Sequence, residues 1–171
     1  MRIVVCVKHV PDMQSERRFE GGRLVRGEDD VLNELDENAI EAAVQLKESE
    51  EDAGREAEVV ALTMGPEDAE DSLMRALQMG ADRAYIVSDE FLEGSDVITT
   101  ASVLSVAIAK IAEECGPVDL VITGMASLDA MTSMLPAALA AKAHMPLLGL
   151  ARSLSVEDGA VTIERAVDGY T

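Results

Sequence analysis

The stretch RIVVCVKHVPD, residues 2–12, decides the fold of this chain. It holds a continuous apolar run, Ile3–Val7, that ends in a charged turn. Three similar runs follow at Glu58–Thr63, Ala84–Val87 and Leu120–Thr123. Strands that are buried on both faces of a parallel sheet have continuous rather than alternating apolar sequences. The four runs therefore predict four strands of a parallel sheet.

In the segments between these predicted strands, apolar residues recur at the spacing of an α-helix. One apolar stripe follows Asn33 and Asp36, either of which is a natural N-cap. A second helix is expected to be capped by Gly65, with Pro66 in its first position and Gly80 just past its end.

The third and fourth helices are predicted in the same way. Asp96 is expected to cap the third, whose inward stripe includes Val97, Ala101, Leu104, Ile108 and Ile111. The fourth is expected over Thr132–Ala143, with Pro136 in its first turn. The alternation predicts an open, mostly parallel α/β sheet with helices on both faces, which is a Rossmann-like fold. We expect residues 1–171 to form a single domain.

Two segments interrupt this alternation and predict small β-hairpins. Glu16–Val31 carries the pair Gly21-Gly22, and Arg152–Ala166 carries Asp158-Gly159 between two alternating stretches. Glycine pairs and Asp-Gly are strong signals for hairpin turns.

The composition excludes several classes of function. A net charge of −19 argues against binding of nucleic acid or of an anionic membrane surface, both of which rest on Lys and Arg. Cys6 and Cys115 are isolated, so we expect free thiols in a reducing compartment and a cytoplasmic protein. The nine methionines suggest an adaptable, apolar surface for a partner.

In sheets of this kind, ligands bind beyond the carboxyl ends of the strands, where the strand order reverses. Gly124–Met134 follows the fourth strand and leads into a helix, so its backbone could approach a phosphate. The alternative is a tight turn with Asp129 as a helix cap. His9, in the turn after the first strand, is expected to be a polar loop residue, and His144 to end the fourth helix. No catalytic triad and no cluster with metal-ligand spacing is recognised.

Three blocks of this sequence resemble the β subunit of electron transfer flavoproteins, called FixA in some bacteria. They are the block Arg2–Asp12, the block Met74–Asp82 after Met64-Gly-Pro66, and the block Asp119–Gly124 with Asp129 and Thr132. The resemblance runs from Met1 to Asp168. Because the β subunits of this family continue further, we expect this chain to be C-terminally shortened.

The resemblance implies an electron carrier subunit rather than an enzyme. A β subunit of this family binds AMP, or a second FAD in bifurcating relatives, and shares FAD with an α subunit. The expected partners are therefore that α subunit and an acyl-CoA dehydrogenase or another flavin or NADH redox partner. The alternatives are a stand-alone adenine-nucleotide-binding regulatory module and, least favoured, an enzyme acting on a nucleotide phosphate, for which no Gly-rich loop with Lys-Ser/Thr is present.

The resemblance also implies which residues face the cofactors. The nucleotide-binding candidates are Cys6, Asn33, Asp36, Met64, Gly124, Ala126, Ser127, Asp129, Thr132, Ser133 and Met134. Met13 is the flavin-facing candidate, at a position where many family members have an aromatic residue. Met134-Leu135 replaces a polar pair of the family and Pro136 replaces a family glycine, which leaves Thr132, Ser133 and backbone N–H groups to hold the phosphate. The other interpretations are helix capping for Asn33 and Asp36, and core packing for Cys6 and Met64.

Overall fold

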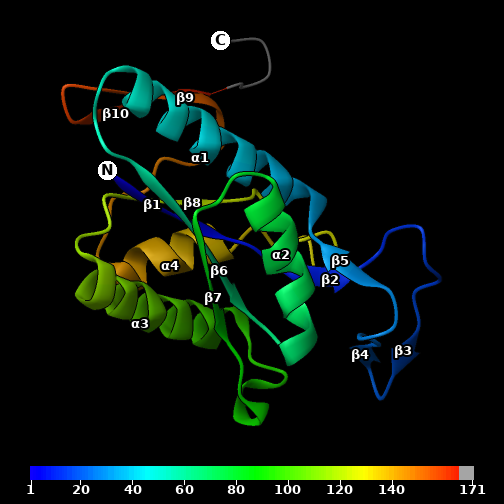
Figure 1. The fold of residues 1–171 in the computed structure, drawn as a ribbon. Coiled ribbons are helices and arrows are strands. Elements are labelled where there is room, and N and C mark those ends of the chain that lie inside the picture. Colours follow the sequence, from blue (N-terminus) through cyan, green and yellow to red (C-terminus); the bar gives the residue numbers. More distant parts are fainter. Residues whose placement is uncertain (166–171) are drawn as a thin grey trace.

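The computed structural model describes residues 1–165 of the chain (Figure 1). Its elements, in chain order, are β1 (Arg2–Cys6), β2 (His9–Pro11), β3 (Phe19–Glu20), β4 (Arg23–Leu24), β5 (Asp30–Leu32), α1 (Glu34–Asp52), β6 (Glu58–Met64), the 3₁₀ turn η1 (Glu67–Ala69), α2 (Glu70–Gln78), β7 (Arg83–Val87), the 3₁₀ turn η2 (Glu90–Leu92), α3 (Val97–Cys115), β8 (Leu120–Thr123), α4 (Leu135–Ala143), β9 (Ala151–Glu157) and β10 (Ala160–Arg165). Ala166 and Asp168, where the second predicted hairpin and the family resemblance end, lie outside the described residues.

The central sheet has the strand order β7–β6–β1–β8, and every neighbouring pair is parallel. Each of the four predicted strands is confirmed to within one residue at either end. The chain moves from β1 to β6 and β7 on one side, then returns to place β8 on the other side of β1. The strand order therefore reverses between β1 and β8, which is where such sheets bind ligands.

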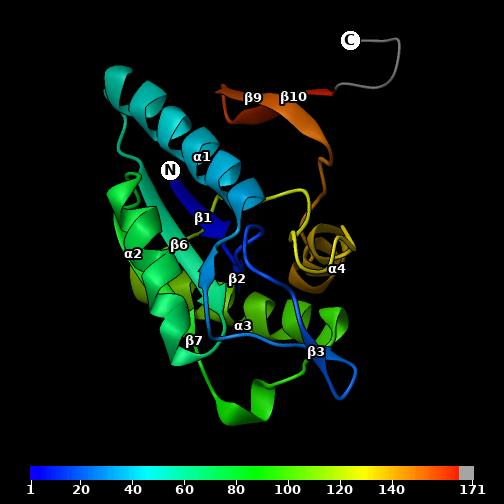
Figure 2. The same cartoon turned by 90° about the vertical axis from the view of Figure 1, so that its right-hand side faces the viewer.

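The alternation of side chains along β1 divides the core into two layers. Ile3 and Val5 are fully buried against residues of α1 and α2, such as Ile40. Val4, also fully buried, packs with Cys6 against α3 and α4 on the opposite face. Figures 1 and 2 show these two helix layers on either side of the sheet. The predicted fold class is therefore confirmed: an α/β sheet covered on both faces.

Two of the predicted helix starts are wrong. Pro66 has an extended backbone, with ψ of 170°, so it is not a helical residue; it precedes the 3₁₀ turn η1, and α2 begins only at Glu70. The helix α4 begins at Leu135 rather than Thr132. Met131 and Ser133 both have φ of 51°, which a right-handed helix cannot contain.

Other helix signals are confirmed. The Asp96 carboxylate accepts a hydrogen bond of 2.7 Å from the Thr99 N–H and caps α3. Pro136 lies in the first turn of α4, and His144 is its C-cap residue in the left-handed conformation. Among residues 1–165, no helix has both the length and the apolar character needed to cross a bilayer.

Both predicted hairpins are present. β3 pairs with β4 around Gly21-Gly22, and β9 pairs with β10 around Asp158-Gly159. A third antiparallel pair, β2 with β5, was not predicted, and it places His9 opposite Leu32. We call residues 12–29, between β2 and β5, the excursion; its β3–β4 hairpin projects from the carboxyl end of the sheet (Figures 1 and 2).

Candidate nucleotide-binding site

Three segments meet at the point where the strand order reverses: the turn after β1, the start of α1, and the loop of residues 124–134 after β8, called here the Gly124 loop. A Cβ atom built on Gly124 would lie 2.2 Å from Asp36 Oδ1 and 2.9 Å from the Leu35 carbonyl oxygen. No residue with a side chain fits there unless α1 moves. Gly124 thus allows the loop to lie directly against the first turn of α1.

Asn33 holds the Gly124 loop rather than capping α1 with its side chain. Its Nδ2 donates to the Ala126 carbonyl at 3.0 Å, and its Oδ1 accepts from the Leu128 N–H at 3.0 Å. The residue is fully buried. It occupies the N-cap position of α1 through its backbone, whose carbonyl accepts from the Asp36 N–H at 2.8 Å. Asn33 is therefore the N-cap residue, as predicted, but its side chain makes no capping hydrogen bond.

Asp36 ties the turn after β1 to the same loop. Its Oδ2 accepts a hydrogen bond of 2.8 Å from the Lys8 N–H. Burial raises the pKa of Asp36 to about 6, although hydrogen bonds from Asn33, Lys8 and Gly124 oppose the shift. Its side chain therefore binds backbone and is not the N-cap.

Cys6, at the end of β1, is buried and carries a free thiol. Burial, with a smaller contribution from the charge of Asp36, raises the pKa of the Cys6 thiol to about 12. The thiol therefore stays protonated at neutral pH and is not a nucleophile. Its packing against the α3 layer agrees with the core interpretation of this residue.

Asp129 contacts two cations, one from the turn after β1 and one from the excursion. Lys8 Nζ lies 2.9 and 3.0 Å from its two carboxylate oxygens, and 3.3 Å from Ser127 Oγ. The Arg26 guanidinium, from the end of the excursion, also contacts this carboxylate. We call Lys8, Arg26, Ser127 and Asp129 the Asp129 cluster.

The Asp129 side chain has no exposed surface, whereas the side chains of Lys8 and Arg26 are each 40% exposed. Burial alone would raise the pKa of Asp129, but hydrogen bonds from Ser127, Lys8 and Arg26 outweigh it and hold that pKa at about 2. The carboxylate is therefore ionised at neutral pH. Its contacts lie before the start of α4, so the interpretation of Asp129 as a cap of that helix is wrong.

The remaining candidates lie further apart. Ala126 is buried beside Asn33, while Thr132, Ser133 and Met134 are exposed along the approach to α4. Met64 ends β6, which is on the far side of β1 from β8, and it packs against the α3 layer. Met13 is 53% exposed in the excursion. The structure thus brings together Cys6, Asn33, Asp36, Gly124, Ala126, Ser127 and Asp129, but not Met64 or Met13.

His9 is not a polar loop residue, which corrects the expectation from sequence. It is buried in β2, and its Nδ1 lies 2.7 Å from Ser72 Oγ of α2. Its carbonyl oxygen lies 3.5 Å from Arg26 Nη1. His9 therefore anchors the turn that carries Lys8, and it also contacts Arg26.

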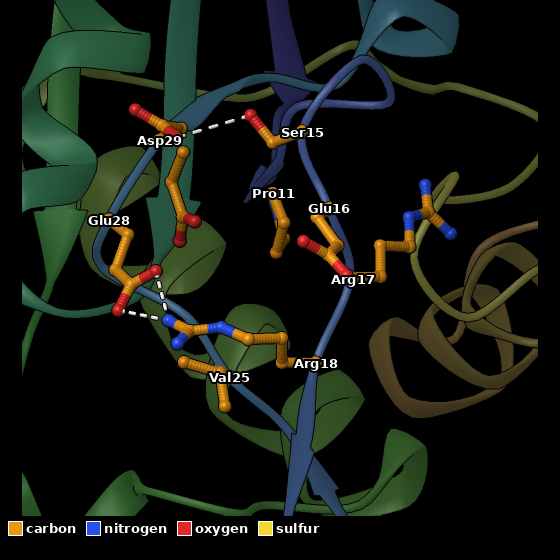
Figure 3. Close-up of a pocket in the computed structure, with 9 residues that line it drawn as sticks. Pro11, Ser15, Glu16, Arg17, Arg18, Val25, Glu28 and Asp29 are labelled. Carbon is orange, nitrogen blue, oxygen red and sulfur yellow. Dashed lines mark hydrogen bonds and ion pairs between the residues drawn. The ribbon is translucent and has the colours of Figure 1, made fainter.

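A cavity of about 480 Å³ lies within the excursion (Figure 3). Its lining residues are Pro11, Ser15, Glu16, Arg17, Arg18, Val25, Glu28, Asp29 and Asp30. Arg18 pairs with Glu28 across it, and none of the predicted nucleotide-binding residues line it. Four carboxylates against two guanidiniums make it a poor site for a phosphate. Arg17 links it to the Gly124 loop, since Nη1 donates to the Leu128 carbonyl at 3.2 Å.

No group of three or more His, Cys, Asp or Glu side chains within residues 1–165 is arranged to hold a metal ion. Sequence reasoning missed three cationic residues of the site, Lys8, Arg17 and Arg26. Four of the fourteen Lys and Arg residues fall within residues 17–26 of this acidic chain, and that concentration was the available signal for the two arginines.

The sequence pattern of the electron transfer flavoprotein domain matches residues 22–171. The chain belongs to the electron transfer flavoprotein family. It is 40% identical over 169 residues to an electron transfer flavoprotein subunit beta of Mycobacterium leprae, and 36% identical over 176 residues to that of Megasphaera elsdenii. It is also 35% identical over 176 residues to a protein FixA of Sinorhizobium fredii.

These alignments cover 97%, 99% and 100% of this chain, respectively, and 62%, 63% and 60% of the relatives. The chain therefore spans about three-fifths of the length of the curated family members that it matches. The resemblance predicted from the sequence blocks is confirmed.

Proposed function

We propose that this chain is a β-type subunit of an electron transfer flavoprotein. It binds an adenine nucleotide, AMP or a second FAD, in the crevice between β1 and β8, and it pairs with an α subunit that holds most of the FAD. The observation that carries this proposal is the meeting of the β1 turn, the start of α1 and the Gly124 loop where the strand order reverses.

The groups present at the crevice fit a phosphate. Lys8 and Arg26 supply half-exposed positive charge, and the exposed residues Thr132 and Ser133 at the end of the Gly124 loop can supply N–H donors. Burial keeps the Cys6 thiol protonated, so this thiol is not a nucleophile at neutral pH. This donor set supports binding of a nucleotide and an electron carrier rather than a catalyst.

The flavin supplies the redox chemistry when it is bound, and the protein's part is to orient and tune it. In this chain the flavin-facing candidate is Met13, a half-exposed thioether. A wall that packs the flavin ring must therefore come largely from the α subunit. A half-exposed thioether at this position favours a flavin site shared with the α subunit over a complete flavin site on this chain.

The nucleotide proposal predicts measurable heat on mixing the protein with at least one of AMP, ADP, ATP and FAD. Asp129→Ala should weaken that binding about tenfold or more, because it releases Lys8 and Arg26 from a buried charge-assisted contact. Isothermal titration calorimetry on folded protein measures both effects. Heat with none of the four ligands would remove the nucleotide proposal.

The partner proposal predicts a 1:1 complex when the chain is co-expressed with the cognate α subunit. The complex should carry flavin absorbance, whereas this chain alone should lose added FAD on desalting. Size-exclusion chromatography with absorbance at visible wavelengths measures both properties. If the two chains elute separately while the α subunit retains FAD and this chain binds AMP, the stand-alone nucleotide-binding module replaces the subunit.

A further inference from the structure

The Asp129 cluster contains two cations and one carboxylate, so it is locally positive in a chain whose net charge is −19. It joins the turn after β1, the end of the excursion and the Gly124 loop, and its two cations come from segments far from Asp129 in the sequence. Arg26 and Asp129 are separated by 103 positions, and Lys8 and Asp129 by 121. Folding therefore brings positive charge together at the Asp129 cluster, although the net negative charge of the chain would repel an anion.

This inference rests on the proposed function and deepens it. We propose that Lys8 and Arg26 recognise the phosphoryl group of the nucleotide, and that Asp129 is a positioning residue which aims these two cations. Asp129 was expected to contact the phosphate itself. In this proposal Lys8 and Arg26 make the phosphate contacts, and Asp129 contacts only these two side chains.

The charge and burial of Asp129 exclude a direct role. An ionised carboxylate repels a phosphate, and the side chain of Asp129 has no exposed surface through which to meet one. The side chains of Lys8 and Arg26 are each 40% exposed, so both can contact a ligand. The depressed pKa of Asp129, about 2, keeps the carboxylate charged and both cations attached throughout the neutral range.

Arg26 keeps donors for a ligand. A guanidinium carries five N–H donors in a planar fork that matches phosphate oxygens. The contacts of Arg26 within residues 1–165 use one nitrogen, Nη2, on Asp129 and another, Nη1, on the His9 carbonyl. Two contacts leave further N–H groups of the fork for a phosphate.

The neighbouring arginines have different partners and provide a matched control. Arg18 pairs with Glu28, and Arg23 lies 3.6 Å from Glu93, whose side chain is 84% exposed. Arg23 carries the same charge in the same excursion, but its ion pair is with the segment after β7. An Arg23 variant without this charge therefore shows how much the loss of one positive charge from the excursion changes nucleotide affinity while the Asp129 cluster stays intact.

The experiment compares AMP with adenosine by calorimetry on the full chain, in complex with its α subunit where one is co-purified. Lys8→Gln and Arg26→Gln should each weaken AMP binding about tenfold or more and leave adenosine binding within about twofold. Arg23→Gln should leave both affinities unchanged, and Arg26→Lys should restore part of the loss. Thermal unfolding confirms that each variant is folded.

The salt dependence of the wild-type protein gives an independent measurement. If Lys8 and Arg26 bind the phosphoryl group, added NaCl weakens AMP binding more than adenosine binding. If only the overall charge of −19 acts on AMP, salt reduces the repulsion and strengthens AMP binding. A wild-type protein that prefers AMP, with Gln variants that keep this preference, would overturn the inference but not the nucleotide site. A wild-type protein that binds neither AMP nor adenosine would overturn the inference, and one that also fails to bind ADP, ATP and FAD would overturn the nucleotide site as well.

Discussion

Gly124→Ala should lower the free energy of unfolding by roughly 3 kcal/mol, the upper part of the usual range for overpacking. The added Cβ would lie 2.2 Å from Asp36 Oδ1 and 2.9 Å from the backbone oxygen of Leu35. The carboxylate cannot swing away without losing its hydrogen bond from the Lys8 N–H. Either α1 or the Gly124 loop must therefore move, and urea denaturation of the purified protein measures the cost.

Gly149→Ala is the matched control for this substitution. A Cβ atom on Gly149 would have no heavy atom within 4 Å apart from those of its chain neighbours, and the φ of Gly149 lies outside the left-handed region. The same methyl group should there be neutral, or stabilising by about 0.4–1 kcal/mol through the unfolded state. Equal effects of the two substitutions would show that the contact between Gly124 and α1 does not constrain the fold.

The strands were predictable because their signal is local. A continuous apolar run such as Ile3–Val7 predicts a buried strand without reference to any distant residue. The order of the four runs along the chain then limits the sheet to few topologies. The start of α3 was predictable for the same reason, since Asp96 caps a helix that begins at the next residue. Each of these features depends on residues that are close together in the sequence.

The contacts of the site were less predictable because they join distant residues. Asn33 contacts Ala126 and Leu128, which lie 93 and 95 positions away, and these partners decide that its side chain does not cap α1. His9 finds Ser72 at a separation of 63 positions. A histidine or asparagine in a turn has the same local sequence whether or not such a partner exists. The sequence therefore predicted which segments these residues lie in, but not which hydrogen bonds their side chains make.

The same crevice should make the stability of the protein depend on pH through Asp36. Burial raises the pKa of Asp36 in the folded state from 3.8 to about 6, so the folded protein binds this proton more tightly than the unfolded chain does. The stabilisation from that proton is complete below about pH 4 and is lost as the pH rises through about 6. The shift corresponds to about 3 kcal/mol, since one pKa unit is about 1.36 kcal/mol.

Asp36→Asn isolates this effect, because an amide does not titrate and the other carboxyl groups contribute equally to both proteins. The variant should gain about 3 kcal/mol relative to wild type between about pH 4 and pH 7, measured as the difference in unfolding free energy from urea denaturation. Asp129 does not disturb the comparison, because its depressed pKa moves its own pH dependence below about pH 4. A difference that stays constant over this range would mean that Asp36 is already ionised in the folded protein at the acidic end of it. Hydrogen bonds from Lys8, Gly124 and Asn33 would then outweigh its burial, and the carboxylate would be a fixed charge of the crevice rather than a titrating one.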